Sequence, residues 1–192
     1  MFKVIICILA GLGAGLGTGF AGMSAAAVIS PMLIVFLDMD PYLSVGIALA
    51  SDVLASAVSA ITYGKNRNLD LRNGLYMMAA VLVFTLAGSY VASLVPGTAL
   101  GGASTFMTML LGIKFIVRPD VAPKQRLINA TKKQKAIRSV AFGALVGLIC
   151  GFVGAGGGMM MLLVLTTILG YELKTAVGTS VLIMSVTAFT GA

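Results

Sequence analysis

The chain has 192 residues, of which 59% are hydrophobic and only 10% are charged. A water-soluble fold usually carries about 25% charged residues, so this composition excludes a soluble globular domain. In lipid, helices satisfy all of their own backbone hydrogen bonds. We therefore expect an all-α fold, a polytopic transmembrane helix bundle that crosses the cell membrane several times.

The first apolar segment covers residues 4–37 without a single charged side chain. As one straight helix it would be about 51 Å long, which exceeds the roughly 30 Å of bilayer hydrocarbon. We therefore expect a Gly-broken helix, with the break near residues 22–24. Pro41 suits the first turn of the next helix, and residues 44–63 form the next expected span.

Residues 73–113 form a second uncharged segment, which is too long for one span and must fold back on itself. Pro96 and Gly97 supply the turn. Two spans are therefore expected, over residues 74–95 and 98–117.

The third uncharged segment covers residues 139–171. It contains Gly156, Gly157 and Gly158 in series, and each glycine costs about 1 kcal/mol relative to alanine inside a helix. A second break is therefore expected at residues 154–158.

Basic side chains gather between the apolar segments, and the chain has a net charge of +7. Lys65, Arg67 and Arg72 precede one expected span, and a larger basic group lies between Lys114 and Arg138. Short loops rich in Lys and Arg stay on the cytoplasmic side of a membrane. Both loops are therefore expected inside, against the lipid bilayer, and we expect no nucleic-acid partner.

The sequence offers little for catalysis. It has no histidine, and its two cysteines, Cys7 and Cys150, lie in apolar segments. His-based metal sites and Ser-His-Asp catalysis are therefore absent from this sequence. We expect no enzyme activity, no catalytic residue, no cofactor and no metal site.

The sequence matches itself without a gap at one constant shift, here named the repeat offset, which places Gly11 on Gly143 and indicates an internal duplication. The identical pairs are Gly11 with Gly143, Gly15 with Gly147, Leu16 with Leu148, Gly19 with Gly151, Phe20 with Phe152, Gly22 with Gly154, Leu33 with Leu165, Leu37 with Leu169, Val45 with Val177, and Gly46 with Gly178. Glycines recur every four residues in both copies, which places them on one helix face. Small residues at this spacing let membrane helices approach closely, so we expect these faces to pack against neighbouring helices.

The duplication divides the chain into three parts. Residues 1–117 form a first membrane repeat, residues 118–138 a basic cytoplasmic loop, and residues 139–192 the start of a second membrane repeat. The first copy continues through a basic loop and two further spans. We therefore expect the second repeat to be truncated, with about one basic loop and two spans to follow.

Several segments resemble the TauE/SafE sulfite exporter family. Its paired Gly-rich motif is similar to Gly22-Met23-Ser24-Ala25-Ala26 followed by Pro31-Met32-Leu33, and to Gly154-Ala155-Gly156-Gly157-Gly158. Its segment of small residues that opens a helix is similar to Ala176-Val177-Gly178-Thr179-Ser180, and its short basic loop to Gly64-Lys65-Asn66-Arg67-Asn68-Leu69-Asp70. The resemblance spans nearly the whole chain.

This resemblance implies a multi-pass membrane permease for small sulfur-containing anions, such as sulfite, thiosulfate or organosulfonates, built from two related halves. A non-transporting membrane assembly or scaffold protein is the alternative. The sequence leaves open which anion is moved, whether it is imported or exported, which ion is coupled, and the oligomeric state.

Backbone N–H groups are the donors that remain for an anion, because no Lys or Arg lies inside an apolar segment. At the N-terminus of a half-helix these groups point together, which suits an oxyanion. The expected substrate-binding residues are Gly22, Ser24 and Ala25 at the first break, Gly154, Gly156 and Gly157 at the second, and Ser51, Thr179 and Ser180 as hydroxyl donors.

Asp52 lies near the middle of the expected span over residues 44–63, where an ionised carboxylate is costly and usually functional. Its counterpart in the second copy is Met184. An ionised Asp52 would repel an anionic substrate, whereas a protonated one would not. We therefore expect Asp52 to carry the proton in proton-coupled anion movement; the alternative is a structural acid held by hydrogen bonds.

The sequence leaves the topology open. If each Gly-rich unit crosses the membrane once, the two copies are parallel, the N-terminus is inside and Glu172 is outside. If each unit dips into the membrane and returns, the copies are inverted and both of these sides are reversed.

Overall fold

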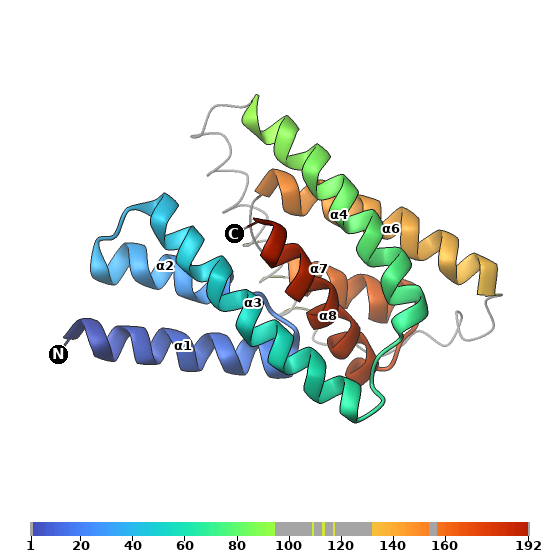
Figure 1. Ribbon diagram of the computed structural model, residues 1–192, viewed down its shortest axis with the longest axis horizontal. Coiled ribbons are helices and arrows are strands. Elements are labelled where there is room, and N and C mark those ends of the chain that lie inside the picture. Colours follow the sequence, from blue (N-terminus) through green and yellow to red (C-terminus); the bar gives the residue numbers. More distant parts are fainter. Residues whose placement is uncertain are drawn as a thin grey trace.

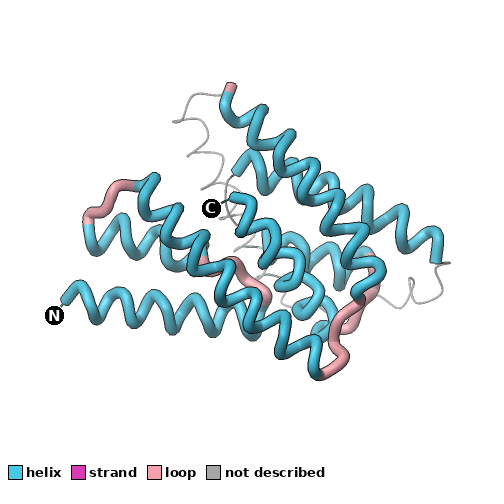
Figure 2. Tube along the Cα trace, viewed as in Figure 1, coloured by secondary structure: helices cyan, strands magenta, loops and turns pink. Residues whose placement is uncertain are grey.

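The computed structural model describes residues 2–94, 109, 113, 117, 132–153 and 157–191. These residues form helices and connecting turns, with no strand among them (Figure 1, Figure 2). The elements are α1 (Phe2–Ala21), α2 (Ala26–Leu37), α3 (Pro41–Lys65), α4 (Leu71–Ser93), α6 (Lys132–Val153), α7 (Gly157–Leu163), the π-helix η2 (Val164–Ile168) and α8 (Leu173–Gly191). The expected all-α fold is confirmed.

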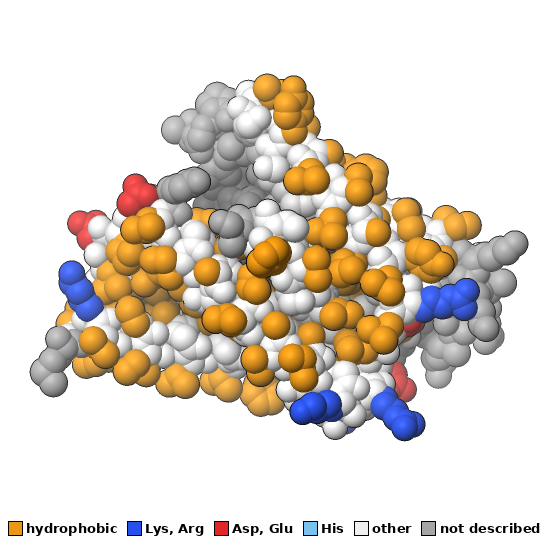
Figure 3. Space-filling view, in the orientation of Figure 1, with side chains coloured by type: hydrophobic (Ala, Val, Ile, Leu, Met, Phe, Trp, Pro, Cys, Tyr) orange, Lys and Arg blue, Asp and Glu red, His pale blue; other side chains and the backbone are white. Residues whose placement is uncertain are grey.

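Within the described residues, four helical segments are long and apolar enough to cross a membrane: Phe2–Ala21, Leu43–Lys65, Leu71–Val91 and Leu173–Thr190. Large apolar side chains cover their outer faces; Leu54 is 71% exposed and Leu86 is 69% exposed. Figure 3 shows hydrophobic side chains across most of the visible face, with Lys and Arg side chains at its edges. A continuous apolar surface of this kind indicates contact with lipid.

The first apolar segment is broken where the sequence predicts. α1 ends at Ala21 and α2 begins at Ala26. Between them Gly22 has a φ of 59°, a left-handed conformation that glycine adopts without steric cost. The two helices then lie side by side as a hairpin (Figure 1), with Ala14 and Ile29 in one apolar cluster.

The expected second break lies partly outside the described residues. α6 ends at Val153 and α7 begins at Gly157, and residues 154–156 lie outside the described part. Gly157 and Gly158 already belong to α7, so the expected break over residues 154–158 is wrong at its end. Glycine has a weak helix propensity, but it is needed at position 158 because a Cβ there would collide with the carbonyl oxygen of Gly22.

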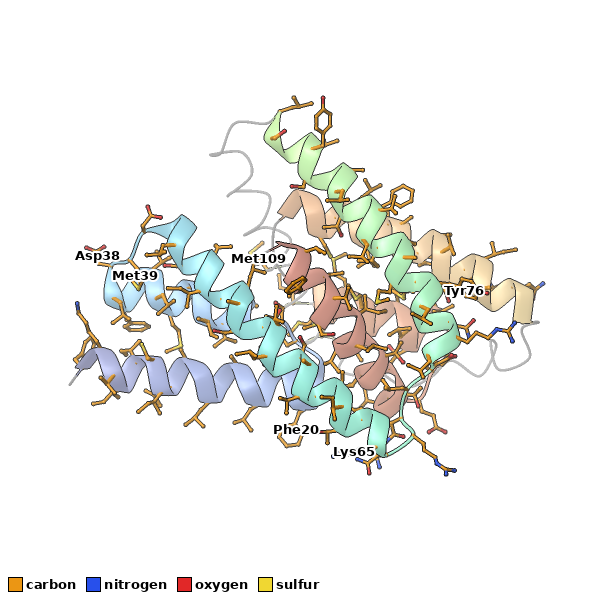
Figure 4. The ribbon with its side chains drawn as sticks, viewed as in Figure 1. Phe20, Asp38, Met39, Lys65, Tyr76 and Met109 are labelled. Carbon is orange, nitrogen blue, oxygen red and sulfur yellow. The ribbon has the colours of Figure 1, made fainter. Side chains whose placement is uncertain are left out.

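α3 begins as the sequence predicts. Pro41 is its first residue, and Oδ1 of Asp40 accepts a hydrogen bond of 3.1 Å from the backbone N–H of Leu43. This side chain satisfies one of the free N–H groups at the helix start. Figure 4 shows Asp38 and Lys65 at opposite ends of α3. The turn after α3, which holds Lys65 and Arg67 and is here named the basic turn, therefore lies at the opposite end of α3 from Asp38.

α4 and α6 pack through glycines and run parallel. A Cβ on Gly143 would lie 2.9 Å from Met77 O, and one on Gly147 would lie 2.5 Å from Val81 O. A Cβ on Gly151 would collide with the next carbonyl along α4, that of Thr85. The expected helix packing through small residues is therefore observed for this set. The matching set, Gly11, Gly15 and Gly19, has no described atom within 4 Å of its Cβ positions.

The helix directions are those expected if each Gly-rich unit dips into the membrane and returns. α1 and α2 form a hairpin, α3 and α4 are joined by a short turn, and α6 runs parallel to α4 (Figure 1). α1 and α6 therefore run in opposite directions. The hydroxyl of Tyr171 bonds to Asp70, so the chain between η2 and α8 lies at the end of the bundle that holds the basic turn.

Two expected features lie mostly outside the described residues. The span over residues 98–117 has only Met109, Ile113 and Val117 within the description. The basic loop over residues 118–138 is described from Lys132 onward, where α6 has already begun.

Candidate functional site

A cavity of about 260 Å³ lies where the two broken segments approach each other. Its walls come from both halves of the chain. The lining residues are Ser24 at the first break; Val45, Leu49 and Asp52 on α3; Val81, Thr85 and Ser89 on α4; Cys150 and Gly151 on α6; Gly157, Gly158 and Met161 on α7; and Met184, Thr187 and Ala188 on α8. A water molecule occupies about 30 Å³ in the liquid, so this cavity can hold a small anion.

Asp52 is the carboxylate of the cavity and is only 3% exposed. Its Oδ2 accepts a 2.6 Å hydrogen bond from Ser24 Oγ, and its Oδ1 accepts a 2.9 Å bond from the backbone N–H of Ala25. Burying a carboxylate is costly unless it is hydrogen-bonded, and these two donors offset that cost. Asp52 thereby ties the first break to α3.

The first break packs against the start of α7 beside the cavity. The carbonyl oxygen of Gly22 faces Gly158, where a Cβ would collide with that oxygen and with Sδ of Met184. A Cβ on Gly22 would in turn lie 2.6 Å from Ser180 Oγ. Glycine is therefore needed at both positions for one half of the chain to pack against the other.

The structure brings five of the predicted site residues to this place. Ser24, Asp52 and Gly157 line the cavity. Ala25 is bonded to Asp52 through its N–H, and Gly22 packs on Gly158 at the crossing. The first break and the start of α7 thus both contribute to the cavity; that these residues bind a substrate stays a prediction.

The other predicted residues lie elsewhere. Ser51 Oγ donates to Ile47 O of its own helix at 2.9 Å. Thr179 and Ser180 are buried but do not line the cavity, and Ser180 Oγ donates to Val177 O at 2.8 Å. Gly154 and Gly156 lie outside the described residues.

Sequence reasoning missed the walls that α4, α6 and α8 supply. Thr85 and Ser89 lie one turn apart on α4 and line the cavity; hydroxyls at this spacing inside an apolar segment were the available signal. Cys150 occupies the position that matches Thr18 at the repeat offset. Met184 was noted as the counterpart of Asp52, and it too lines the cavity.

The charge of the cavity limits how an anion could be held. The described lining contains one carboxylate, Asp52, and neither Lys nor Arg. Hydroxyl and backbone N–H groups are therefore the donors within the described walls. The first-break donors, Ser24 and Ala25, are bonded to Asp52 in this conformation.

A second polar cluster joins the two halves at the basic end. Tyr171 donates its hydroxyl to Asp70 Oδ2 at 2.5 Å, and the Asp70 N–H donates to Thr179 Oγ1 at 3.2 Å. Burial raises the pKa of Asp70, but hydrogen bonds from Tyr171 and from the first residues of α4 outweigh it and leave this pKa below its ordinary value of 3.8. Burial and the Asp70 carboxylate raise the pKa of Tyr171. This contact therefore joins an ionised acid to a neutral phenol at neutral pH.

The amino-acid sequence is similar to that of known membrane proteins. The profile of the family described as "Sulfite exporter TauE/SafE" matches residues 7–192. "Probable membrane transporter protein YunE" of Bacillus subtilis (strain 168) is 22% identical over 207 residues, which cover 97% of this chain and 76% of that protein. "Probable membrane transporter protein YdhB" of the same organism is 22% identical over 170 residues, covering 88% of this chain and 69% of that protein. No solved structure matches the chain.

The family match extends over nearly the whole chain and confirms the resemblance that the Gly-rich motifs carry. The family and these relatives are membrane transporters, which agrees with the expectation that the chain is not an enzyme. The four candidate spans fit a multi-pass membrane protein. The chain therefore belongs to the TauE/SafE family of membrane transporters.

Proposed function

We propose that this transporter moves small sulfur-containing anions, of the class of sulfite, thiosulfate and organosulfonates, and couples their movement to a proton on Asp52. The family description names sulfite export. A cavity of about 260 Å³ suits an anion of a few heavy atoms. The observation that carries the proposal is the pair of hydrogen bonds from Ser24 and Ala25 to Asp52.

Substrate and Asp52 compete for the same donors. When Asp52 is ionised, it holds the Ser24 hydroxyl and the Ala25 N–H, and its charge repels an anion in a medium of low dielectric constant. When Asp52 takes up a proton, the repulsion disappears and both donors can turn to the substrate. One proton and one anion therefore occupy the cavity together and leave together.

The charge balance of the cavity favours singly charged substrates. No cationic side chain belongs to the described lining, and Asp52 can neutralise itself only by binding a proton. A second negative charge on the substrate would be removed from water without a compensating partner, which is costly. Bisulfite and organosulfonates are therefore assigned as better substrates than dianionic sulfite or thiosulfate.

An inverted duplication forms the scaffold of this site. At the repeat offset the helix limits correspond, since α1 ends at Ala21 and α6 at Val153. Asp38 and Gly170, which correspond in the same way, both have positive φ values, 52° and 70°. α1 and α6 run in opposite directions, as the two copies do in transporters with inverted repeats.

The basic turn gives the orientation in the membrane. Lys65, Arg67 and Arg72 are assigned to the cytoplasmic side by the positive-inside rule. Tyr171 is bonded to Asp70 at the same end of the bundle. The chain around Tyr171 is then inside, and the N-terminus of α1 is outside.

Uptake into proteoliposomes of the purified natural protein tests the proposal. Labelled sulfite, thiosulfate and an alkanesulfonate without an amino group are offered separately, with sulfate as a control anion of double charge. We expect saturable uptake of the sulfonate, and uptake of sulfite that increases as the pH falls and bisulfite becomes the main species. Equal, non-saturable signals for every anion and for empty liposomes would contradict transport and favour a scaffold role.

A further inference from the structure

The cavity extends from the middle of the bundle away from the basic turn. α3 ends at this turn, and its lining residues begin at Val45 and reach no further than Asp52, near the middle of the helix. α4 begins beside the turn, and its lining residues run from Val81, near its middle, to Ser89. On α8, which begins at the same end, the first lining residue is Met184. Along these three described helices, the cavity therefore stops short of the basic end.

Apolar side chains fill the region between the cavity and the basic end. Met77 on α4 and Val177 on α8 are 0% and 1% exposed, and both belong to one apolar cluster with Ala60 on α3. Moving an anion from water into a dry apolar region is costly. Among the described residues, this packing therefore blocks the way from the cavity to the basic end.

Polar contacts close the same region at the basic end itself. Tyr171 donates its hydroxyl to Asp70 Oδ2, and the Asp70 N–H donates to Thr179 Oγ1 at 3.2 Å. Beside them, a Cβ on Gly74 would lie 3.0 Å from Thr179 Cγ2. These contacts join the start of α4 to the start of α8. They are only partly buried, so water can replace these hydrogen bonds when the two segments move apart.

The helices around the cavity form two closely packed pairs. α4 lies along α6 (Figure 1), where a Cβ on Gly147 would lie 2.5 Å from Val81 O. α8 packs on α3, where a Cβ on Gly178 would lie 2.9 Å from Tyr63 Cβ. Close packing transmits movement instead of absorbing it, so we expect each pair to move as one body. Both pairs supply walls of the cavity, which therefore lies at the boundary between them.

We infer that Asp70, Tyr171 and Thr179, here named the basic-end gate, form the barrier that must open before an anion can pass between the cavity and the basic end of the bundle. The inference rests on the proposed transport function, and the orientation proposed there makes this the cytoplasmic gate. The gate opens when the α3–α8 pair moves away from the α4–α6 pair. Because Thr179 and Met184 both belong to α8, this movement changes the gate and the cavity wall together.

A disulfide between α4 and α8 tests whether the gate must open. A Cβ on Gly74 lies so close to the Thr179 side chain that cysteines at the two positions are within disulfide range. The purified natural protein with Gly74→Cys and Thr179→Cys is placed in proteoliposomes and oxidised with copper phenanthroline. Uptake of a labelled alkanesulfonate is measured before oxidation, after it, and after addition of dithiothreitol. We expect oxidation to reduce uptake to the level of empty liposomes and the reductant to restore it.

A disulfide inside the α1–α2 hairpin is the matched control. A Cβ on Gly13 would lie 3.6 Å from Val28 Cγ1, so Gly13→Cys with Val28→Cys joins two helices that the gate does not separate. We expect this link to leave uptake unchanged. Undiminished uptake by the protein linked between positions 74 and 179 would overturn the inference, and so would an equal loss of uptake in both linked variants.

Native Cys150 reports on the gate without any anion being carried, because it lines the cavity. Inside-out membrane vesicles expose the basic end to a small cationic methanethiosulfonate that does not cross membranes. Mass spectrometry of the peptide that contains Cys150 gives the rate of modification. Tyr171→Phe removes one hydrogen bond of the gate, so we expect Cys150 to react faster than in the wild type. Tyr76→Phe, at an exposed tyrosine of α4, is the control.

The two measurements separate the gate from transport itself. Equal rates of Cys150 modification in the wild type and in Tyr171→Phe would overturn the inference even if the wild type carries anions. A faster rate in Tyr171→Phe alone supports the gate, even if uptake by the wild type is absent and the proposed function therefore fails.

Discussion

The hydroxyl of Ser24 donates a 2.6 Å hydrogen bond to the carboxylate of Asp52, 28 residues further along the chain. This bond connects the break between α1 and α2 to the interior of α3. It places an acid and a non-helical stretch of backbone in the wall of one cavity. The stability of the break and the proposed proton step therefore depend on the same pair of atoms.

Removing the Ser24 hydroxyl should destabilise the protein. Ser24→Ala leaves Asp52 with the Ala25 N–H as its remaining partner outside α3, and losing a hydrogen bond to a buried charged group costs about 1–3 kcal/mol. Thermal unfolding in detergent measures the loss. Ser185→Ala is the matched control, because Ser185 Oγ donates a hydrogen bond to Leu182 O of its own helix. Equal melting temperatures for the two variants would contradict the structural role of Ser24.

Adding a methyl group at Gly158 should weaken the packing between the two halves of the chain and destabilise the protein. In Gly158→Ala the new Cβ meets Gly22 O and Met184 Sδ, and overpacking of this kind costs about 1–3 kcal/mol. We expect a lower melting temperature and reduced uptake. Gly13→Ala is the control, since its Cβ would lie at an ordinary 3.6 Å from Val28 Cγ1. If Gly158→Ala is as stable as Gly13→Ala, the first break does not pack against α7 as described.

The contact between Asp70 and Tyr171 should make stability depend on acid pH. The pKa of Asp70 in the folded protein lies below its ordinary value of 3.8. Its carboxylate therefore stabilises the fold above that value, and the contribution is lost as the pH falls through the lowered folded pKa. Melting temperatures of the wild type between about pH 5 and pH 3 should fall more steeply than those of Asp70→Asn. Glu172→Gln, at an exposed acid, is the control, and parallel curves for wild type and Asp70→Asn would contradict this role.

The first break, the spans formed by α3 and α4, and the presence of an acid inside a span could be predicted because each depends on a local property. An uncharged segment longer than the bilayer is thick must break or turn, and Gly22 supplies the conformation for it. A single acid inside a span is costly wherever the helix packs. These properties are readable from the order of residues alone.

The cavity walls could not be predicted in the same way, because they depend on which helices are neighbours. Membrane helices are apolar all round, so no hydrophobic stripe shows which face is inward. Ser51 and Asp52 are adjacent in sequence, but successive helix residues point about 100° apart, and Ser51 bonds to its own helix. Thr85 and Ser89 enter the site only because α4 packs tightly on the glycines of α6.

The effect of Asp52→Asn on proton coupling tests the central claim most directly. Uptake of a labelled sulfonate into proteoliposomes is measured with and without a lower pH outside, because a sulfonate keeps one negative charge across the working range. The wild type should take up more sulfonate when the outside is acidic, and the variant should show the same uptake under both conditions. An Asp52→Asn variant whose uptake responds to the pH gradient as strongly as that of the wild type would contradict the account.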